Sequence, residues 1–380
     1  MKKPLQRLNN IRMRTKINLP TALYIHIPFC ESICDYCDFT KLQYFHSFAK
    51  KYLVALKREL NERVQNKDIK TIYIGGGTPT SLDDKQFEAL LKMVEPYSKN
   101  AIEYTVEANP ESLSLSKIKQ LKKYGVNRVS IGVESTHDQI LKSINRKHTF
   151  SDVKSVMRNL RDNNIDNINL DLIIGLPNVS FKMLEEDIKN ILSLKPKHIS
   201  CYSLTVHEHT VFYINKIEEP DEEFAYQAYK SINSLLEKSG FTHYEVSNWA
   251  LPGYESKHNL VYWNNKRYYG IGLGASGYID NIRYKNSTNF NQYVSFMNEI
   301  EQEIVTPSDE KDYELMLRLR TKFGVNLIDY QKKFGVDLYA SHKQVIDEYI
   351  AQGYLTLQDN VLAPTFEGMM ILDKIYLDLA

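Results

Sequence analysis

The segment "ALYIHIPFCESICDYCDF", residues 22–39, decides how the rest of the chain is interpreted. An apolar, β-rich run over residues 22–27 is followed within ten residues by Cys30, Cys34 and Cys37. A structural zinc ion takes four ligands, so three local cysteines leave it one ligand short. A [4Fe–4S] cluster held by only three thiolates keeps one iron open to another ligand. The spacing therefore favours such a cluster over a zinc site.

The remaining cysteine, Cys201, is the alternative source of a fourth ligand. It lies far along the chain, in a β-rich run over residues 198–204. A cysteine that binds nothing is among the residue types most often buried. We therefore expect Cys201 to be a structural residue inside a strand.

Composition narrows the class of protein. The 380 residues are 43% hydrophobic and 25% charged, as is usual for soluble globular proteins. With 48 Lys and Arg against 47 Asp and Glu, the chain has no overall field to attract nucleic acid or an anionic membrane. Four cysteines are too few for a disulfide scaffold and favour a reducing compartment. We expect a cytoplasmic protein with no nucleic-acid partner and no transmembrane segment.

Residues 1–20 differ from the rest, because the first sixteen carry basic side chains and no acidic one. Organelle-targeting peptides are also basic and poor in acids, but this segment lacks serine. We interpret it as a basic, flexible tail, with Met13 as an alternative start.

From residue 21 to about 240, short β-rich runs alternate with helical stretches. The helical stretches have apolar residues at i, i+3, i+4 and i+7, the spacing of helices with one buried face. Such alternation predicts right-handed βαβ crossovers and a parallel sheet. With six convincing units, we predict an α/β fold containing an open, partial (β/α)6 barrel rather than an eight-stranded one. Ligands should then bind at the carboxyl ends of the strands. The expected strands are residues 22–27, 71–76, 102–108, 128–133, 167–174 and 198–204.

The pattern changes after residue 240. Residues 241–305 are rich in Gly, Asn and aromatic residues, which indicates a loop-rich segment with short strands. Residues 306–380 predict helices followed by a hairpin around Asp359 and Asn360, as in a small winged-helix module. The module's charges are mixed rather than basic, so packing against the barrel or a partner is favoured over DNA binding.

Several motifs occur in an order that resembles a known family: "LYIHIPFCESICDYCDF", "GGGTPT" at 75–80, "EANPESL" at 107–113, "NRVSIGVES" at 127–135, "LDLIIGLP" at 170–177 and "YEVSNWALPGYESKHNLVYW" at 244–263. From about residue 21 to the C-terminus, the chain resembles radical S-adenosylmethionine (SAM) proteins of the coproporphyrinogen oxidase-like branch. The resemblance implies that Cys30, Cys34 and Cys37 hold a [4Fe–4S] cluster, and that SAM chelates its open iron.

The same motifs predict the residues around SAM. Glycines let the backbone approach a ligand closely, and in the family the glycine loop meets the methionine amino group. Carboxylates at strand ends suit ammonium and hydroxyl groups, while Arg suits a carboxylate. Glu134 stands where relatives most often have Gln, which leaves its ribose contact open. For each charged residue, a helix cap or an ion pair is the alternative. The predicted SAM-binding residues are Tyr24, Tyr36, Gly76, Gly77, Thr78, Glu107, Glu134, Arg146 and Asp171.

The branch contains two kinds of protein, an oxygen-independent coproporphyrinogen III dehydrogenase and a haem chaperone. The dehydrogenase carries a further cysteine two residues after the third, where this chain has Phe39. The chaperone carries His-Asn-x-x-Tyr-Trp, which this chain has at residues 258–263. The resemblance thus favours a haem chaperone, with no catalytic residue, that passes haem to acceptor apo-proteins and can form a homodimer. It implies that His258 contacts haem, whereas a hydrogen-bonded structural histidine is the alternative.

Other interpretations stay open at this point. The chain could be the dehydrogenase, a radical SAM enzyme with an unrelated substrate, or a winged-helix regulator that uses its cluster as a redox sensor. His207 and His209 form a His-x-His pair where the branch commonly has Glu-Pro-Gly-Thr. The pair could bind a metal or haem, but two ordinary histidines in an exposed loop are the simpler interpretation.

Overall fold

The main sheet of the computed structural model, which describes residues 19–297 and 299–380, has nine strands in the order β11-β1-β4-β5-β6-β7-β8-β10-β9. Six consecutive strands are parallel and follow chain order. Each of them begins and ends within one residue of its expected bounds, which confirms the partial (β/α)6 barrel. They are β1 (Ala22–Ile27), β4 (Thr71–Gly76), β5 (Glu103–Ala108), β6 (Arg128–Glu134), β7 (Asn167–Ile174) and β8 (His198–Ser203).

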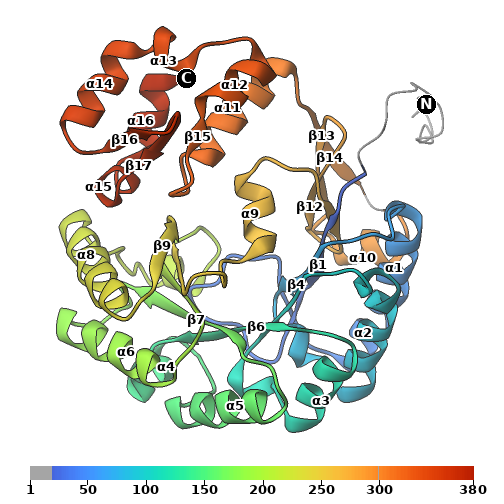
Figure 1. Ribbon diagram of the computed structural model, residues 1–380. Helices are drawn as coiled ribbons and strands as arrows, with labels where there is room; N and C mark the ends of the chain where they lie inside the picture. The colour runs from blue at the N-terminus through green and yellow to red at the C-terminus, as the bar shows by residue number, and fades with distance from the viewer. Residues whose placement is uncertain (1–18, 298) are drawn as a thin grey trace.

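Helices cover the outside of this curved sheet (Figure 1). Helix α5 shows why they form: a capping box between Thr149 and Asp152 starts it, and apolar residues such as Val153 and Leu160 are buried against the strands. The helices are α1 (His46–Arg63), α2 (Asp84–Ser98), α3 (Leu115–Lys123), α4 (Asp138–Ser143), α5 (Phe150–Asp162), α6 (Phe181–Ser193) and α8 (Glu222–Lys238).

The two faces of the strands differ in chemistry. Val129 and Ile131 of β6 are fully buried in the apolar core that the helices share. The alternate residues Arg128 and Ser130 point to the other face, because side chains alternate along a strand. That inner face is polar on the neighbouring strands too, so the interior of the barrel can hold a charged ligand.

The sheet extends past the boundary expected at residue 240. Strands β9 (Thr242–Glu245) and β10 (Asn248–Ala250) continue it antiparallel beyond β8, and β11 (Tyr269–Ile271) pairs parallel with β1. Trp249 anchors this extension, since it is fully buried and its ring stacks on His243 at 4.2 Å. Part of the expected loop-rich segment therefore belongs to the sheet.

The rest of the chain forms two smaller units. Strands β12 (Ser276–Ile279), β13 (Ile282–Asn286) and β14 (Ile300–Ile304) make an antiparallel sheet next to α10 (Phe290–Val294). The C-terminal module has its own hydrophobic core and a three-stranded antiparallel sheet, as expected of a winged-helix-like unit. Its elements are α11 (Pro307–Arg318), β15 (Val325–Asn326), α12 (Leu327–Phe334), α13 (Leu338–Ser341), α14 (Lys343–Ala351), β16 (Leu355–Gln358), β17 (Val361–Pro364), α15 (Phe366–Met369) and α16 (Leu372–Leu379).

Two further expectations concern the N-terminal segment and the absence of a transmembrane segment. The predicted basic tail over residues 1–20, with Met13, lies outside the described residues except for Leu19 and Pro20. Within the described part, none of the helices combines the length and apolar character that a bilayer crossing requires.

Candidate functional site

A cavity of about 350 Å³ opens at the carboxyl ends of the parallel strands. It brings together almost all of the residues predicted from the motifs, although they come from five different strand ends and the loops between them. Those that line it are Cys30, Tyr36, Cys34, Cys37, Gly76, Gly77, Thr78, Glu107, Glu134, Arg146 and Asp171.

Cys30 ends β2 (Phe29–Cys30), and Cys34 and Cys37 lie in the loop that leads to β3 (Leu42–Gln43). The two strands pair with each other and hold the ends of this cysteine loop together. Thr78 Oγ1 lies 3.6 Å from Cys30 Sγ, and Arg146 Nη1 lies 3.5 Å from Cys34 Sγ. Burial raises the pKa of the Cys30 thiol to about 12, so metal binding has to displace its proton. Cys201 is fully buried in β8, as expected of a structural cysteine.

The cysteine loop fits a cluster better than a single metal ion. Among the described residues, no three His, Cys, Asp or Glu side chains converge closely enough to hold one ion. A zinc site needs such convergence, because its ligands share one metal at about 2.0–2.3 Å. In a cluster each thiolate binds its own iron, so its cysteines need not meet at one point.

The glycine loop packs directly against the base of the cysteine loop. The Gly77 N–H donates to the Ile27 carbonyl at 2.8 Å, and Thr78 N–H donates to Phe29 at 2.7 Å. A Cβ on Gly77 would lie 2.8 Å from the backbone of Pro28. Gly76 has φ +113°, a conformation that only glycine adopts readily. Any side chain here would separate the two loops.

Two carboxylates stand on the wall of the cavity below these loops. Glu107 accepts hydrogen bonds from Tyr73 Oη at 2.7 Å and Gly76 N–H at 2.9 Å. Burial raises the pKa of Glu107 to about 7. Asp171 accepts from Asn169 at 2.6 Å and from Ser130 at 3.3 Å, and burial raises its pKa as well. Both oxygens of each carboxylate are thereby oriented for a cationic or hydroxyl-bearing ligand.

Glu134 and Arg146 form a buried ion pair at the end of β6, with Oε1 and Nη2 3.1 Å apart. Glu134 has φ +66°, and the pairing of β6 with β7 shifts register between Gly132 and Glu134. This bulge turns the Glu134 side chain toward the cavity. Burial raises the pKa of Glu134, and the charge of Arg146 opposes that shift. Arg146 thus serves both as the partner of Glu134 and as a donor beside Cys34.

Tyr24 does not line the cavity, although it was expected to flank the cofactor. Its hydroxyl contacts His26 Nδ1 at 2.9 Å, and its ring lies 6.2 Å from that of Tyr73. Residue 24 shares the inner face of β1 with residue 26 but lies one residue pair farther from the strand's carboxyl end. Its place is therefore beneath the residues that form the cavity wall.

His258 is also placed differently from the expectation. It belongs to α9 (Lys257–Trp263), which lies across the amino ends of β4 and β5, away from the cysteines. Its side chain is fully buried, and its ring nitrogens contact Thr71 Oγ1 at 3.0 Å and Tyr262 Oη at 2.7 Å. Glu103 accepts its backbone N–H at 2.8 Å. This position supports a structural role and leaves neither ring nitrogen for haem iron.

Replacing His258 with alanine should lower the free energy of unfolding by about 3 kcal/mol, because the buried Thr71 hydroxyl and the partly buried Tyr262 hydroxyl lose their hydrogen bonds. Urea unfolding followed by circular dichroism measures this loss. The exposed His46, changed to glutamine, is the matched control and should unfold like the original chain. A His258→Ala chain as stable as the original would contradict the structural role.

Comparison with known proteins gives the family. A family model described as the radical SAM superfamily matches residues 24–191, and one described as the HemN C-terminal domain matches residues 306–371. A Bacillus subtilis protein named heme chaperone HemW is 37% identical over 93% of this chain and 98% of its own length. A Lactococcus lactis protein of the same name is 39% identical over 88% and 91%. The chain belongs to the HemW family of radical SAM proteins. Membership implies an iron–sulfur cluster and SAM.

The fold of the HemW-family chain also matches a solved relative. The Escherichia coli coproporphyrinogen III oxidase HemN, described as a radical SAM enzyme, superposes with a TM-score of 0.81 over 95% of this chain and 90% of its own. Its sequence is 21% identical, so this likeness concerns the fold.

Several residues of the cavity in this HemW-family chain were not predicted. Three of them line the cavity because their side chains point to the inner face of the sheet, as those of the motif residues do. They are Tyr73, Ser130 and Tyr202. Because side chains alternate along a strand, the residues two positions before Gly75 and Gly132 face the same way, and this rule could have identified the first two. Phe39 lines the mouth and is 65% exposed. It places a phenyl ring, which cannot bind iron, where a further cysteine occurs in the dehydrogenase kind.

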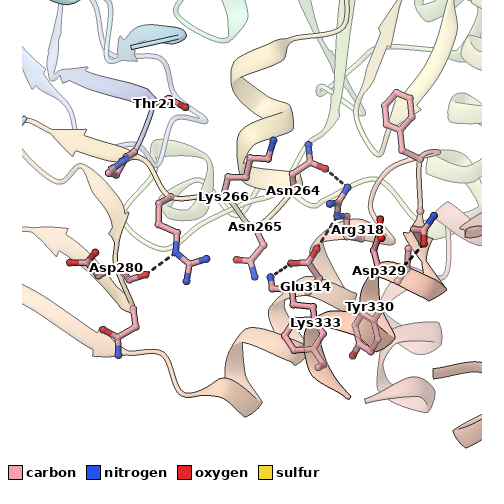
Figure 2. A pocket seen from close by; sticks show the side chains of 18 of the residues that line it. Thr21, Asn264, Asn265, Lys266, Asp280, Glu314, Arg318, Asp329, Tyr330 and Lys333 are labelled. Atoms are coloured by element: carbon pink, nitrogen blue, oxygen red, sulfur yellow. Dashed lines mark hydrogen bonds and ion pairs between the residues drawn. The ribbon is translucent and has the colours of Figure 1, made fainter. Parts of the chain in front are cut away.

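A larger hollow of about 1100 Å³ lies between the end of α9 and the C-terminal module (Figure 2). Several of its charged side chains pair with one another. Glu314 pairs with Arg318 at 3.1 Å and with Lys333 at 3.0 Å, and Arg318 also donates to Asn264. This polar junction joins the module of the HemW-family chain to the segment after α9, and none of its lining residues is a cysteine or histidine.

Proposed function

We propose that this chain is a haem chaperone that holds a [4Fe–4S] cluster with bound SAM, binds haem and passes it to acceptor apo-proteins. The observation that carries the proposal is its relationship to proteins named heme chaperone HemW, which it matches over nearly their whole length. Phe39 supports the same choice, since a bulky apolar side chain occupies the mouth at the position that would distinguish the dehydrogenase.

In this proposal, Cys30, Cys34 and Cys37 bind three irons as thiolates. The glycine loop and Glu107 receive the methionine part of SAM, while Asp171 and the Glu134–Arg146 pair bind its other polar groups. A cluster with SAM on its open iron supplies one-electron reducing chemistry when bound. The residues of the chain orient SAM and hold the cluster in the cavity at the carboxyl ends of the strands. His258 contributes by fixing α9 across the opposite end of the barrel.

SAM affinity should fall as the pH drops below about 7, because Glu107 then takes up a proton and loses its charge. If only the carboxylate form binds, the dissociation constant rises by a factor that approaches ten per pH unit below the pKa of Glu107. Isothermal titration calorimetry at pH 6, 7 and 8 measures this dependence.

The matched variant is Glu107→Gln, which should bind SAM weakly at every pH. Cluster absorbance is recorded in the same samples, so that cluster loss at pH 6 is not mistaken for weak binding. A SAM affinity of the original chain that does not change between pH 6 and pH 8 would contradict this role for Glu107.

Two further parts of the proposal concern setting and assembly. We place the protein in the cytoplasm, where a reducing environment keeps its cysteines available for iron. The homodimer stays a prediction, which light scattering after size-exclusion chromatography can check.

One comparison tests the proposed function. The cluster is reconstituted without oxygen, and haem binding, haem transfer to apomyoglobin and turnover of coproporphyrinogen III with SAM are measured in parallel. We expect one haem bound per chain, transfer to apomyoglobin and no decarboxylation. Turnover of coproporphyrinogen would overturn the chaperone proposal, and so would the absence of haem binding.

A further inference from the structure

The histidines of the chain differ sharply in their availability to a haem iron. Five of the ten are buried in hydrogen-bonded or stacked positions. They are His26, His148, His198, His243 and His258. Of the others, His207 is the histidine that lines the cavity beside the cysteine loop. Its side chain is about half exposed, so an incoming ligand can reach it.

The imidazole of His207 is oriented by a carboxylate. His207 Nε2 lies 3.3 Å from Asp38 Oδ2, and Asp38 follows Cys37 directly. Among the described residues, no group hydrogen-bonds to the other ring nitrogen, Nδ1. Histidines that bind metals commonly give one nitrogen to a carboxylate and the other to the metal, since the carboxylate fixes the ring and increases its basicity.

The loop that carries His207 is held firmly against the cysteine loop. Thr210 Oγ1 donates to the His207 carbonyl at 2.7 Å and so fixes the backbone of the turn. Helix α7 (Val211–Ile214) follows, and the Phe212 N–H donates to the Asp35 carbonyl at 3.0 Å. The ring of Phe212 also lies 6.2 Å from that of Tyr36, which lines the cavity. His207 is therefore a fixed feature of the rim and not a residue of a loose loop.

Two partly exposed aromatic side chains line the same cavity as this histidine. Phe39 and Tyr202 line the cavity with it, and they are 65% and 45% exposed. On α7, Tyr213 and Ile214 are also exposed to solvent. Exposed aromatic groups at the cavity, with further exposed apolar groups on the helix α7 that packs against the cysteine loop, indicate a surface that an apolar partner covers. A porphyrin offers two flat apolar faces and an iron that accepts an imidazole nitrogen.

We propose that haem docks on the rim of the cavity with its iron on His207 Nδ1, oriented by Asp38, and with its porphyrin against Phe39, Tyr202 and α7. This inference rests on the proposed function and names the residues through which the chain would hold its cargo. A cavity of about 350 Å³ is too small for SAM and haem together, so haem covers the opening instead of entering it. Haem and the cluster then lie on the same side of the barrel.

The test is a titration of the cluster-loaded full chain with ferric haem, followed by Soret absorbance and electron paramagnetic resonance. His207→Ala should raise the dissociation constant of haem at least about tenfold and change the spectral signature of the axial ligand. Asp38→Asn should weaken binding less, because the imidazole is kept but loses its orienting charge. His209→Asn is the matched control: residue 209 is exposed, has φ +71°, which Asn tolerates, and should leave haem binding unchanged.

Cluster content and SAM affinity of each variant are measured in the same preparations, so that damage to the cysteine loop is recognised. Haem binding by His207→Ala with the original affinity and spectrum would overturn the inference while leaving the chaperone proposal intact. Loss of haem binding in a folded His258→Ala chain, with His207→Ala unaffected, would do the same and would favour α9. An original chain that binds no haem would overturn both.

Discussion

Replacing Cys34 with alanine should abolish the iron–sulfur cluster and, with it, SAM binding. The loop offers three thiolates, and among the described residues no other cysteine than the buried Cys201 exists to replace a lost one. Arg146 Nη1 lies beside Cys34 Sγ, so the substitution also leaves the guanidinium without its sulfur partner. Iron and sulfide analysis after anaerobic reconstitution, together with visible absorbance, measures cluster content.

Cys201→Ala is the matched control for this experiment. Cys201 is fully buried on β8, away from the cavity, so its loss should reduce stability by on the order of 1 kcal/mol and leave cluster content unchanged. A Cys34→Ala chain that still contains four irons and binds SAM would contradict the assignment of the three cysteines. Loss of the cluster in Cys201→Ala at full folding would show a ligand role that this structure does not support.

The strands of the barrel could be predicted from the sequence within one residue because their signal is local. Each is a short run of buried, β-branched residues between polar turns, as in "NINLDLII" at β7. The outer helices carry an equally local signal in their apolar spacing. Pairing between strands that lie far apart in the sequence has no such local signal. The three residues of β11 join the sheet beside β1, more than two hundred residues earlier, and nothing in "YGI" specifies that partner.

The site residues could be predicted from the sequence where a motif lies at the end of a strand, because the carboxyl ends of parallel strands meet at one edge of the sheet. How far the cavity extends along the strands could not be predicted in this way. Tyr73 lines the cavity one residue pair before the glycine motif, and Ser130, although it lies inside a motif, lines it one residue pair before Gly132. The position of His258 was missed because a motif shows which residues are neighbours but not which end of the barrel they meet. Tyr262, one helical turn after His258, is the local signal that could have indicated their hydrogen bond.

Replacing Glu245 with glutamine should stabilise the chain, and increasingly so as the pH rises. Glu245 ends β9 at the seam with the C-terminal module, where it forms an antiparallel bridge with Thr321. It is 1% exposed, and burial raises its pKa to about 8 from an ordinary value of 4.5. Its nearest donors are the Asn248 side chain and, at 3.5 Å, the Ser247 N–H. No cation pairs with it among the described residues.

The raised pKa fixes the direction of the effect. Between about pH 4.5 and pH 8, the folded chain keeps the Glu245 proton that the unfolded chain has lost, so unfolding releases a proton. Stability therefore falls as the pH rises through this window, by about 1.4 kcal/mol per unit and on the order of 5 kcal/mol in total. A glutamine stays neutral at every pH and avoids this loss.

Urea unfolding midpoints of the two chains at pH 5.5, 7 and 8.5 measure the difference, which should widen with each step and be largest at pH 8.5. The control is Glu95→Gln on the exposed side of α2, where neither form of the side chain is buried and the difference should stay near zero. If the Glu245→Gln chain gains nothing at pH 8.5, the carboxylate must already be ionised at little cost. The seam would then have to admit water or a cation to Glu245, and the module would be less closely joined to the barrel than the bridge between Glu245 and Thr321 implies.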